Sequence, residues 1–289
     1  METIRFIRII FIGIFFLGAS LSFLLVAGKR GDLSVSFLDV GQGDAIYIVS
    51  PTGREFLIDG GRDGTVIQKL RPLKPFWDNT FDIILETHPD LDHIGGLFSV
   101  FRHYSSDVIF LSYASSSTSF DESLLRVSKE EEKKNGSRII YAEEGMEFDL
   151  GGGVHCMILF PQHNFTAQDT NDYSTVVLLS YGEKSFLFMG DAPQDVENRI
   201  ISQYSLKNIT VLKAGHHGSD TSTSPKFLAE TKPSYTILSV GKENSYGHPH
   251  PRVLSLLEKF KTTILRTDES GTITFKVSAQ GEVKVFLEK

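Results

Sequence analysis

The sequence has 289 residues, of which 40% are hydrophobic and 22% are charged, and it contains a single cysteine. These proportions exclude a collagen-like chain, a disulfide-stabilised scaffold and a wholly disordered protein. Its 29 lysine and arginine residues are outnumbered by 36 aspartate and glutamate residues, and the formal net charge is −7. Such a chain lacks the positive field of a typical duplex-DNA-binding protein, so any contact with nucleic acid must be local.

The N-terminal region has the pattern of a membrane-spanning segment. Ile9 to Ala27 form a run of 19 residues without charge, which as a helix spans about 28 Å. Arg5 and Arg8 precede the run and favour an N-terminus inside the cell. We expect residues 1–30 to be an uncleaved signal anchor, with residues 31–289 outside the cytoplasmic membrane. A cleaved signal peptide and a buried core helix are the alternatives.

From Leu33 onward, short apolar strands alternate with helices. Strands are expected at residues 33–38, 45–49, 55–58, 81–86, 108–111, 138–141, 155–160, 175–180, 185–189, 209–212 and 235–240, with a hairpin near 273–284. Helices are expected at residues 66–73, 95–104, 119–136, 193–204, 225–230 and 251–260. This alternation, without a long linker, predicts one α/β domain with two sheet layers.

Six of the nine histidines fall into three short clusters, each expected directly after a strand. The clusters are residues 87–93 (THPDLDH), 215–219 (GHHGS) and 247–250 (GHPH), and Asp191 also follows a strand. Loops at the carboxyl ends of strands meet at one edge of a sheet. Two imidazoles and two carboxylates within six residues repel one another unless a cation lies among them. The sequence therefore predicts a metal site at this edge.

The remaining histidines, His103, His155 and His163, lack ligand-like neighbours and are expected on a helix face, a strand and a loop. Asp59 precedes Gly60-Gly61 and is expected to have a structural role in that turn.

The ordered motifs resemble the metallo-β-lactamase superfamily, and more narrowly the soluble domain of ComEC-type competence proteins. The motifs are Phe37–Ala45 (FLDVGQGDA), Leu57–Gly61 (LIDGG), His88–His93, Lys213–Ser219 and Gly247–Pro251. The resemblance implies a four-layer αββα sandwich over residues 31–289. It also implies a metal-dependent phosphodiesterase or nuclease that acts on DNA during DNA uptake.

The resemblance further implies two divalent metal ions, zinc or manganese, bridged by Asp191. The implied metal ligands are His88, Asp90, Asp92, His93, Asp172, Asp191, His217 and His248. The implied catalytic residues are Asp92, Asp191, His216 and His217, with the roles of the last two left undivided. Substrate binding is assigned to Lys213, Ser219, Gln42 and Asp44, although a turn role for Gln42 and Asp44 is equally consistent with the sequence.

Two positions depart from the superfamily pattern. Asp90 stands where a second histidine is usual, and residues 171–174 (NDYS) stand where a further histidine is usual. More oxygen ligands move the first site toward harder cations such as Mn²⁺ or Mg²⁺.

The single apolar segment cannot itself form a DNA channel, so a separate channel protein is an expected partner. Three classes of function remain open. The first is a membrane-tethered phosphodiesterase or nuclease. The second is another hydrolase on this scaffold, such as a lactonase, thioesterase or small-phosphoester enzyme. The third is a low-turnover accessory subunit of a DNA channel.

Overall fold

The computed structural model describes residues 31–114 and 119–289. The expected signal anchor in residues 1–30 lies outside the described residues. Within the described ranges, no helix is long and apolar enough to cross a membrane. Asp32–Lys289 form one compact unit.

Two stacked sheets form the centre of this unit, which confirms the expected α/β class with two sheet layers. The first sheet, in spatial order, contains β15 (Val283–Leu287), β14 (Ile273–Val277), β1 (Leu33–Phe37), β2 (Ile46–Val49), β3 (Glu55–Ile58), β4 (Thr80–Leu85), β5 (Ser105–Leu111) and β6 (Arg138–Tyr141). The second sheet contains β13 (Thr263–Arg266), β12 (Tyr235–Leu238), β11 (Val211–Lys213), β10 (Lys184–Phe188), β9 (Val176–Tyr181), β8 (Val154–Phe160) and β7 (Glu147–Gly151). β7 and β13 were not expected from the sequence, because both strands mix charged or polar residues with apolar ones.

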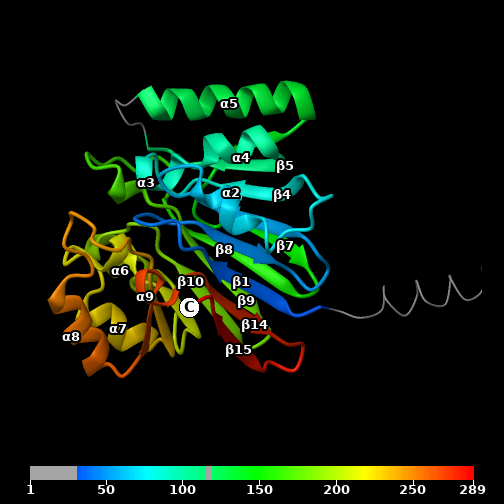
Figure 1. The fold of residues 1–289 in the computed structure, drawn as a ribbon. Helices are drawn as coiled ribbons and strands as arrows, with labels where there is room; N and C mark the ends of the chain where they lie inside the picture. The colour runs from blue at the N-terminus through cyan, green and yellow to red at the C-terminus, as the bar shows by residue number, and fades with distance from the viewer. Residues whose placement is uncertain (1–30, 115–118) are drawn as a thin grey trace, which may run out of the picture. The chain divides into compact units, whose positions relative to one another are not determined.

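Helices cover the outer face of each sheet (Figure 1). On the first sheet lie α2 (Thr65–Leu70), α4 (Leu97–His103) and α5 (Ser119–Asn135). On the second sheet lie α6 (Gln194–Gln203), α7 (Pro225–Thr231) and α8 (Pro251–Lys259). The short elements are α3 (Leu91–Ile94), α9 (Thr267–Ser270) and the 3₁₀ turns η1 (Asn171–Tyr173) and η2 (Gly215–Gly218).

Three apolar layers hold the sandwich together. Between the sheets, Phe37 packs against Phe188 and Phe275 with ring centroids 6.1 Å apart in each pair. Outside the sheets, Leu57 of β3 faces the first set of helices and Leu187 of β10 faces the second. Strands buried on both faces read as continuous apolar runs, which is why most of the parallel strands, though not β13, were recognisable in the sequence.

Neighbouring parallel strands end together at one edge. β3, β4 and β5 run parallel in the first sheet, and β10, β11, β12 and β13 run parallel in the second. Two of the three histidine clusters follow β4 and β11 as expected. The third does not directly follow a strand, because β12 ends at Leu238 and a loop separates it from His248.

Candidate metal centre

Short, tightly packed turns carry the polar side chains at this edge. His217 lies in η2 with a φ of 55°, a left-handed conformation that is strained for any residue except glycine. The turn fits because a Cβ on Gly215 would lie 2.6 Å from the Ala192 carbonyl oxygen. The GHHG segment therefore brings its histidines to the cluster at a conformational cost, as is usual at functional sites.

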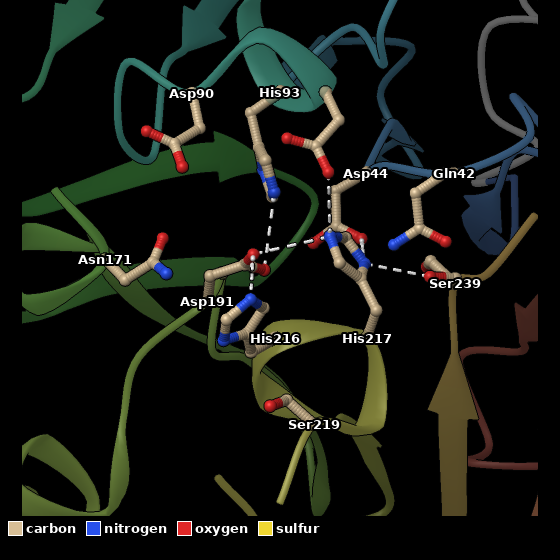
Figure 2. A network of polar contacts seen from close by, with 12 residues as sticks. Gln42, Asp44, Asp90, His93, Asn171, Asp191, His216, His217, Ser219 and Ser239 are labelled. Atoms are coloured by element: carbon tan, nitrogen blue, oxygen red, sulfur yellow. Dashed lines mark hydrogen bonds and ion pairs between the residues drawn. The ribbon is translucent and has the colours of Figure 1, made fainter. Parts of the chain in front are cut away.

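Asp191 lies at the centre of the cluster (Figure 2). Its Oδ1 is 3.3 Å from His93 Nε2, and its Oδ2 is 3.3 Å from His217 Nε2. His217 Nε2 is also 3.4 Å from Asp92 Oδ2. Side chains from three separate loops, after β4, β10 and β11, thus meet around one carboxylate.

The donor atoms of this cluster fit divalent metal ions. His88 Nε2, His93 Nε2, His217 Nε2 and Asp191 Oδ1 are all buried, and none has a hydrogen-bond partner. One ligand atom each from His88, His93 and Asp191 lie within 4.8 Å of one another, as do those of Asp92, His93 and His217. Buried polar atoms without partners are costly, and a metal ion is a ligand that would satisfy nitrogen and oxygen together.

All three buried histidines are held in the same tautomer. His93 Nδ1 donates to Asp59 Oδ2 at 2.7 Å, and His217 Nδ1 donates to the Ser239 carbonyl oxygen at 2.8 Å. The Thr87 hydroxyl donates to Asp59 and is 3.1 Å from His88 Nδ1, so it accepts from that nitrogen. Each Nε2 is consequently directed at the cluster, where it offers a lone pair once a metal displaces its proton, as metal-binding histidines do.

The role of Asp59 differs from the expected turn role. Its carboxylate is fully buried and accepts hydrogen bonds from the Thr87 backbone N–H, the Thr87 hydroxyl and His93. The sequence did contain a sign of this role, because Asp59 directly follows a strand. Residues that follow neighbouring parallel strands meet at the same edge of the sheet, even when they are far apart in sequence.

Electrostatic interactions in the cluster favour the charged forms of Asp191 and His93 but not of His88. Burial raises the pKa of the Asp191 carboxyl, but His217 and His93 outweigh burial and hold it well below the ordinary value. Burial lowers the pKa of His93, yet Asp191 and Asp59 together raise it well above the ordinary value. For His88, burial dominates and lowers the pKa to about 4. Metal binding at such a site displaces protons from the imidazoles.

Lys213 and Asp44 form a buried ion pair beneath the cluster. Lys213 Nζ is 2.5 Å from Asp44 Oδ2 and donates to the Gly190 carbonyl oxygen at 3.1 Å. It lies 3.9 Å from Asp191 Oδ1 and has no exposed surface. Substrate binding was expected for Lys213, and either substrate binding or a turn role for Asp44. The structure places both side chains in the interior, where Lys213 contacts the Asp191 loop at the Gly190 carbonyl oxygen.

Within the 171–174 segment, Asn171 rather than Asp172 faces the cluster, and the Ser174 hydroxyl accepts from the Asp191 backbone N–H at 3.0 Å. Figure 2 shows Asn171 and Asp90 on one side of Asp191 and His217 on the other. Asn171 Oδ1 is buried without a hydrogen-bond partner. Asp172 belongs to none of the ligand groups, and its pKa is raised by partial burial and by its acidic neighbours Asp169 and Asp195. Asp90 lies 3.8 Å from His88 Nε2 and accepts from the Thr170 hydroxyl at 2.6 Å.

His216 and His248 lie at the solvent side of the cluster. His216 Nε2 is 3.8 Å from Asp191 Oδ2, its Nδ1 is 3.1 Å from the Thr221 hydroxyl, and its side chain is partly exposed. The His248 ring is 5.4 Å from the His216 ring, and His248 Nδ1 is buried without a partner. Neither histidine belongs to the groups of converging ligand atoms.

Ser219 and Gln42 make contacts within the protein. The Ser219 hydroxyl accepts from Thr221, which in turn contacts His216, so Ser219 supports that imidazole. Gln42 Oε1 accepts from the Gly241 backbone N–H at 3.2 Å. The histidines set aside in the sequence, His103, His155 and His163, are exposed and lie outside the cluster.

The chain is similar to several known proteins. A family model described as the metallo-beta-lactamase superfamily matches residues 38–110, which include the first loop and the His88–His93 motif. ComE operon protein 3 of Bacillus subtilis is 30% identical over 261 residues, covering 84% of this chain and 33% of the relative. Recombination protein 2 of Haemophilus influenzae is 30% identical over 249 residues, covering 83% of this chain and 28% of the relative. The chain thus spans about a third of the length of the curated relatives it matches.

A solved structure has the same fold at low identity. The metallo-beta-lactamase fold protein YhfI from Bacillus subtilis matches with a TM-score of 0.56 and 12% identity, covering 88% of this chain and 100% of that one. Together with the family match and the competence-type relatives, this likeness confirms the resemblance inferred from the motifs. Residues 38–110 match the metallo-beta-lactamase superfamily, and most of the chain is similar to competence-type proteins, among them competence protein ComA of Neisseria gonorrhoeae, which is 28% identical over 257 residues.

Proposed function

We propose that this protein is a membrane-tethered, metal-dependent phosphodiesterase that cleaves DNA. The observation that carries the proposal is the convergence of unpartnered, buried imidazole and carboxylate atoms around Asp191. The fold is that of a metal-dependent hydrolase family, and the similarity to competence-type proteins favours DNA as the phosphodiester.

Two divalent ions, zinc or manganese, would be held on the two sides of Asp191. His88, Asp90 and Asn171 would hold one, with Asn171 in the place first given to Asp172. Asp92, His93 and His217 would hold the other. The chemistry that such ions supply when bound is activation of a water molecule and neutralisation of phosphate charge.

The residues around this centre have supporting tasks in the proposal. Asp59 and the Ser239 carbonyl fix the His93 and His217 rings. Lys213 and Asp44 compensate one another and keep the Asp191 loop in place. His216, at the solvent side and within 3.8 Å of Asp191, is placed to move a proton at Nε2 to or from a leaving alkoxide, with His248 beside it.

The sequence pattern of residues 1–30 supports a single-pass anchor in the cytoplasmic membrane, with the hydrolase domain on the outer side. From the similarity to competence-type proteins, we also propose that a channel protein is the partner that supplies or removes the DNA.

The test uses the full chain in detergent, loaded with Mn²⁺ or Zn²⁺ and freed of excess metal. Metal content is measured, and linear single-stranded DNA, a chromogenic phosphodiester and a lactone are offered. We expect bound metal and DNA cleavage, both lost in Asp191→Asn and both retained in His155→Gln, which alters an exposed histidine outside the cluster. Lactone turnover with intact DNA would replace the proposal with another hydrolase, and bound metal without any turnover would favour an accessory subunit.

A further inference from the structure

The loop between α2 and β4 exposes two neighbouring aromatic side chains. Phe76 is 93% exposed and Trp77 is 73% exposed, more than any other large hydrophobic side chain in the described residues. Their rings form an edge-to-face pair with centroids 4.8 Å apart. Leu73, at the start of the loop, is also exposed. Two adjacent exposed aromatic rings make this loop a candidate contact surface.

The base of this loop is held firmly in the domain. Lys74 is buried, forms an ion pair with Glu55, and donates to the Thr80 carbonyl oxygen at 2.6 Å. Its ammonium group also lies 4.7 Å from the centre of the Phe81 ring. The Asp78 backbone N–H closes a turn onto the Pro75 carbonyl oxygen at 3.0 Å, which leaves the two aromatic residues at the tip. The tip is therefore presented by a fixed turn, so its exposure is a feature of the fold.

The loop lies at the edge where the strands of the first sheet begin. Ser34 of β1 pairs with Val49 of β2, and Val49 pairs with Glu55 of β3. β3 and β4 run parallel, so β4 begins at this same edge (Figure 1). Three strand spacings place the start of β4 about 14 Å from the start of β1. The metal centre lies at the opposite edge, where β4 ends.

The chain that enters this edge carries the apolar run of the sequence. Ala27 precedes Leu33 by six residues, which reach at most about 20 Å in any conformation. If the proposed tether holds, the edge that carries Phe76 and Trp77 lies within reach of the bilayer surface. The strand beginnings at this edge carry exposed charges of both signs, with Arg71 after α2, Arg102 before β5 and Arg138 at the start of β6, and Asp107 in β5.

We propose that the loop with Phe76 and Trp77 at its tip docks into the interfacial zone of a lipid bilayer. Tryptophan and phenylalanine side chains partition into this zone, and arginines beside them are attracted to anionic headgroups. Docking through this edge turns the metal centre away from the membrane, toward substrate in solution. The inference rests on the proposed membrane tether and adds an orientation to it.

Trp77 is the only tryptophan in the chain, so the intrinsic fluorescence of the unmodified protein reports on this loop. The full chain is reconstituted into phosphatidylcholine–phosphatidylglycerol vesicles with or without brominated acyl chains. We expect brominated lipid to remove at least about half of the fluorescence, and acrylamide quenching to fall relative to the protein in detergent-free buffer with chelator. Flotation of the chain with the vesicles is measured in the same sample and reports on the tether separately.

A matched probe at the other edge gives the control. Trp77→Phe combined with Tyr113→Trp moves the fluorophore to a residue just after β5 that is 41% exposed. This variant should float equally well and remain unquenched by brominated lipid.

Each outcome separates the two proposals. A chain that floats while Trp77 stays unquenched overturns the docking inference and leaves the tether intact. Equal quenching at both probes also overturns it, because the domain then has no preferred orientation. Shielding of Trp77 from acrylamide in native membranes but not in lipid vesicles identifies a protein as the occupant and overturns the lipid assignment. A chain that does not float removes both proposals together.

Discussion

Replacing Lys213 by methionine tests the interior position of this lysine. The ammonium group has no exposed surface and lies between Asp44 Oδ2 at 2.5 Å and the Gly190 carbonyl oxygen at 3.1 Å. Methionine has a similar length and no charge, so Lys213→Met leaves the buried Asp44 carboxylate without its main partner. A lysine that only bound substrate would be removable without loss of stability.

The expected loss of unfolding free energy in Lys213→Met can be worked out from the ion pair. Removing one partner of a buried pair costs about 3–5 kcal/mol of unfolding free energy. Burial raises the pKa of Asp44, but Lys213, His217 and His93 outweigh burial and hold it at about 2 against an ordinary value of 3.8. That difference corresponds to about 2 kcal/mol. Since His217 and His93 remain in the variant, we expect a loss of about 3 kcal/mol, or a fall in Tm of roughly 6–12 °C.

The sign of the pH dependence of stability follows from the pKa of Asp44. Because folding lowers the pKa of Asp44, its contribution is present above the unfolded value of 3.8 and is lost as the pH falls through about 2. The difference in stability between the wild type and Lys213→Met should therefore be largest near neutral pH and should narrow as the pH falls below that unfolded value.

Urea denaturation of the full chain in detergent with a chelator measures these differences. The matched control is the double variant Asp44→Asn with Lys213→Met, which contains no unpaired charge at this place. It should be more stable than Lys213→Met alone. Wild-type stability in Lys213→Met, or a double variant less stable than the single one, would refute the reasoning.

Three further changes probe the site and the core. Asp59→Asn should weaken metal binding about 10–100-fold, measured by competition with a chelating dye, because the His93 ring loses the acceptor that fixes its tautomer; unchanged affinity would contradict that role. Asn171→His should raise the ratio of bound zinc to manganese when both are supplied, since it exchanges an oxygen ligand for nitrogen, whereas Asp172→His should leave the ratio unchanged. Phe188→Ala should lower the unfolding free energy by about 3–5 kcal/mol in urea titrations, because the ring is buried between the two sheets; a loss below about 1 kcal/mol would argue against tight packing there.

Much of the fold was predictable because the strands are short and almost wholly apolar. The run Phe81–Leu85 and the polar motif that follows it fixed both a buried strand and the loop at its end. The helix expected over residues 119–136 was confirmed as Ser119–Asn135, since its start has a capping pattern and Gly136 follows its end. β7 and β13 were not predicted, because their sequences contain charged or polar residues and their burial depends on neighbours in the sheet.

The sequence by itself determined the kinds of ligand and the loops that carry them, because dense His and Asp motifs after apolar strands have few other physical explanations. Only the tertiary structure decided which adjacent polar side chain enters the cluster. In the 3₁₀ turn at residues 171–173, Asn171 has a buried side-chain oxygen, whereas Asp172 lies among acidic neighbours. The spacing of residues along the chain does not predict which of the two side chains faces the cluster. Likewise, Asp59 reaches His93 across 34 residues, and Lys213 reaches Asp44 across the two sheets. Such pairs form because strands from distant parts of the chain end at the same edge. The strands share this edge only when the whole sandwich is packed.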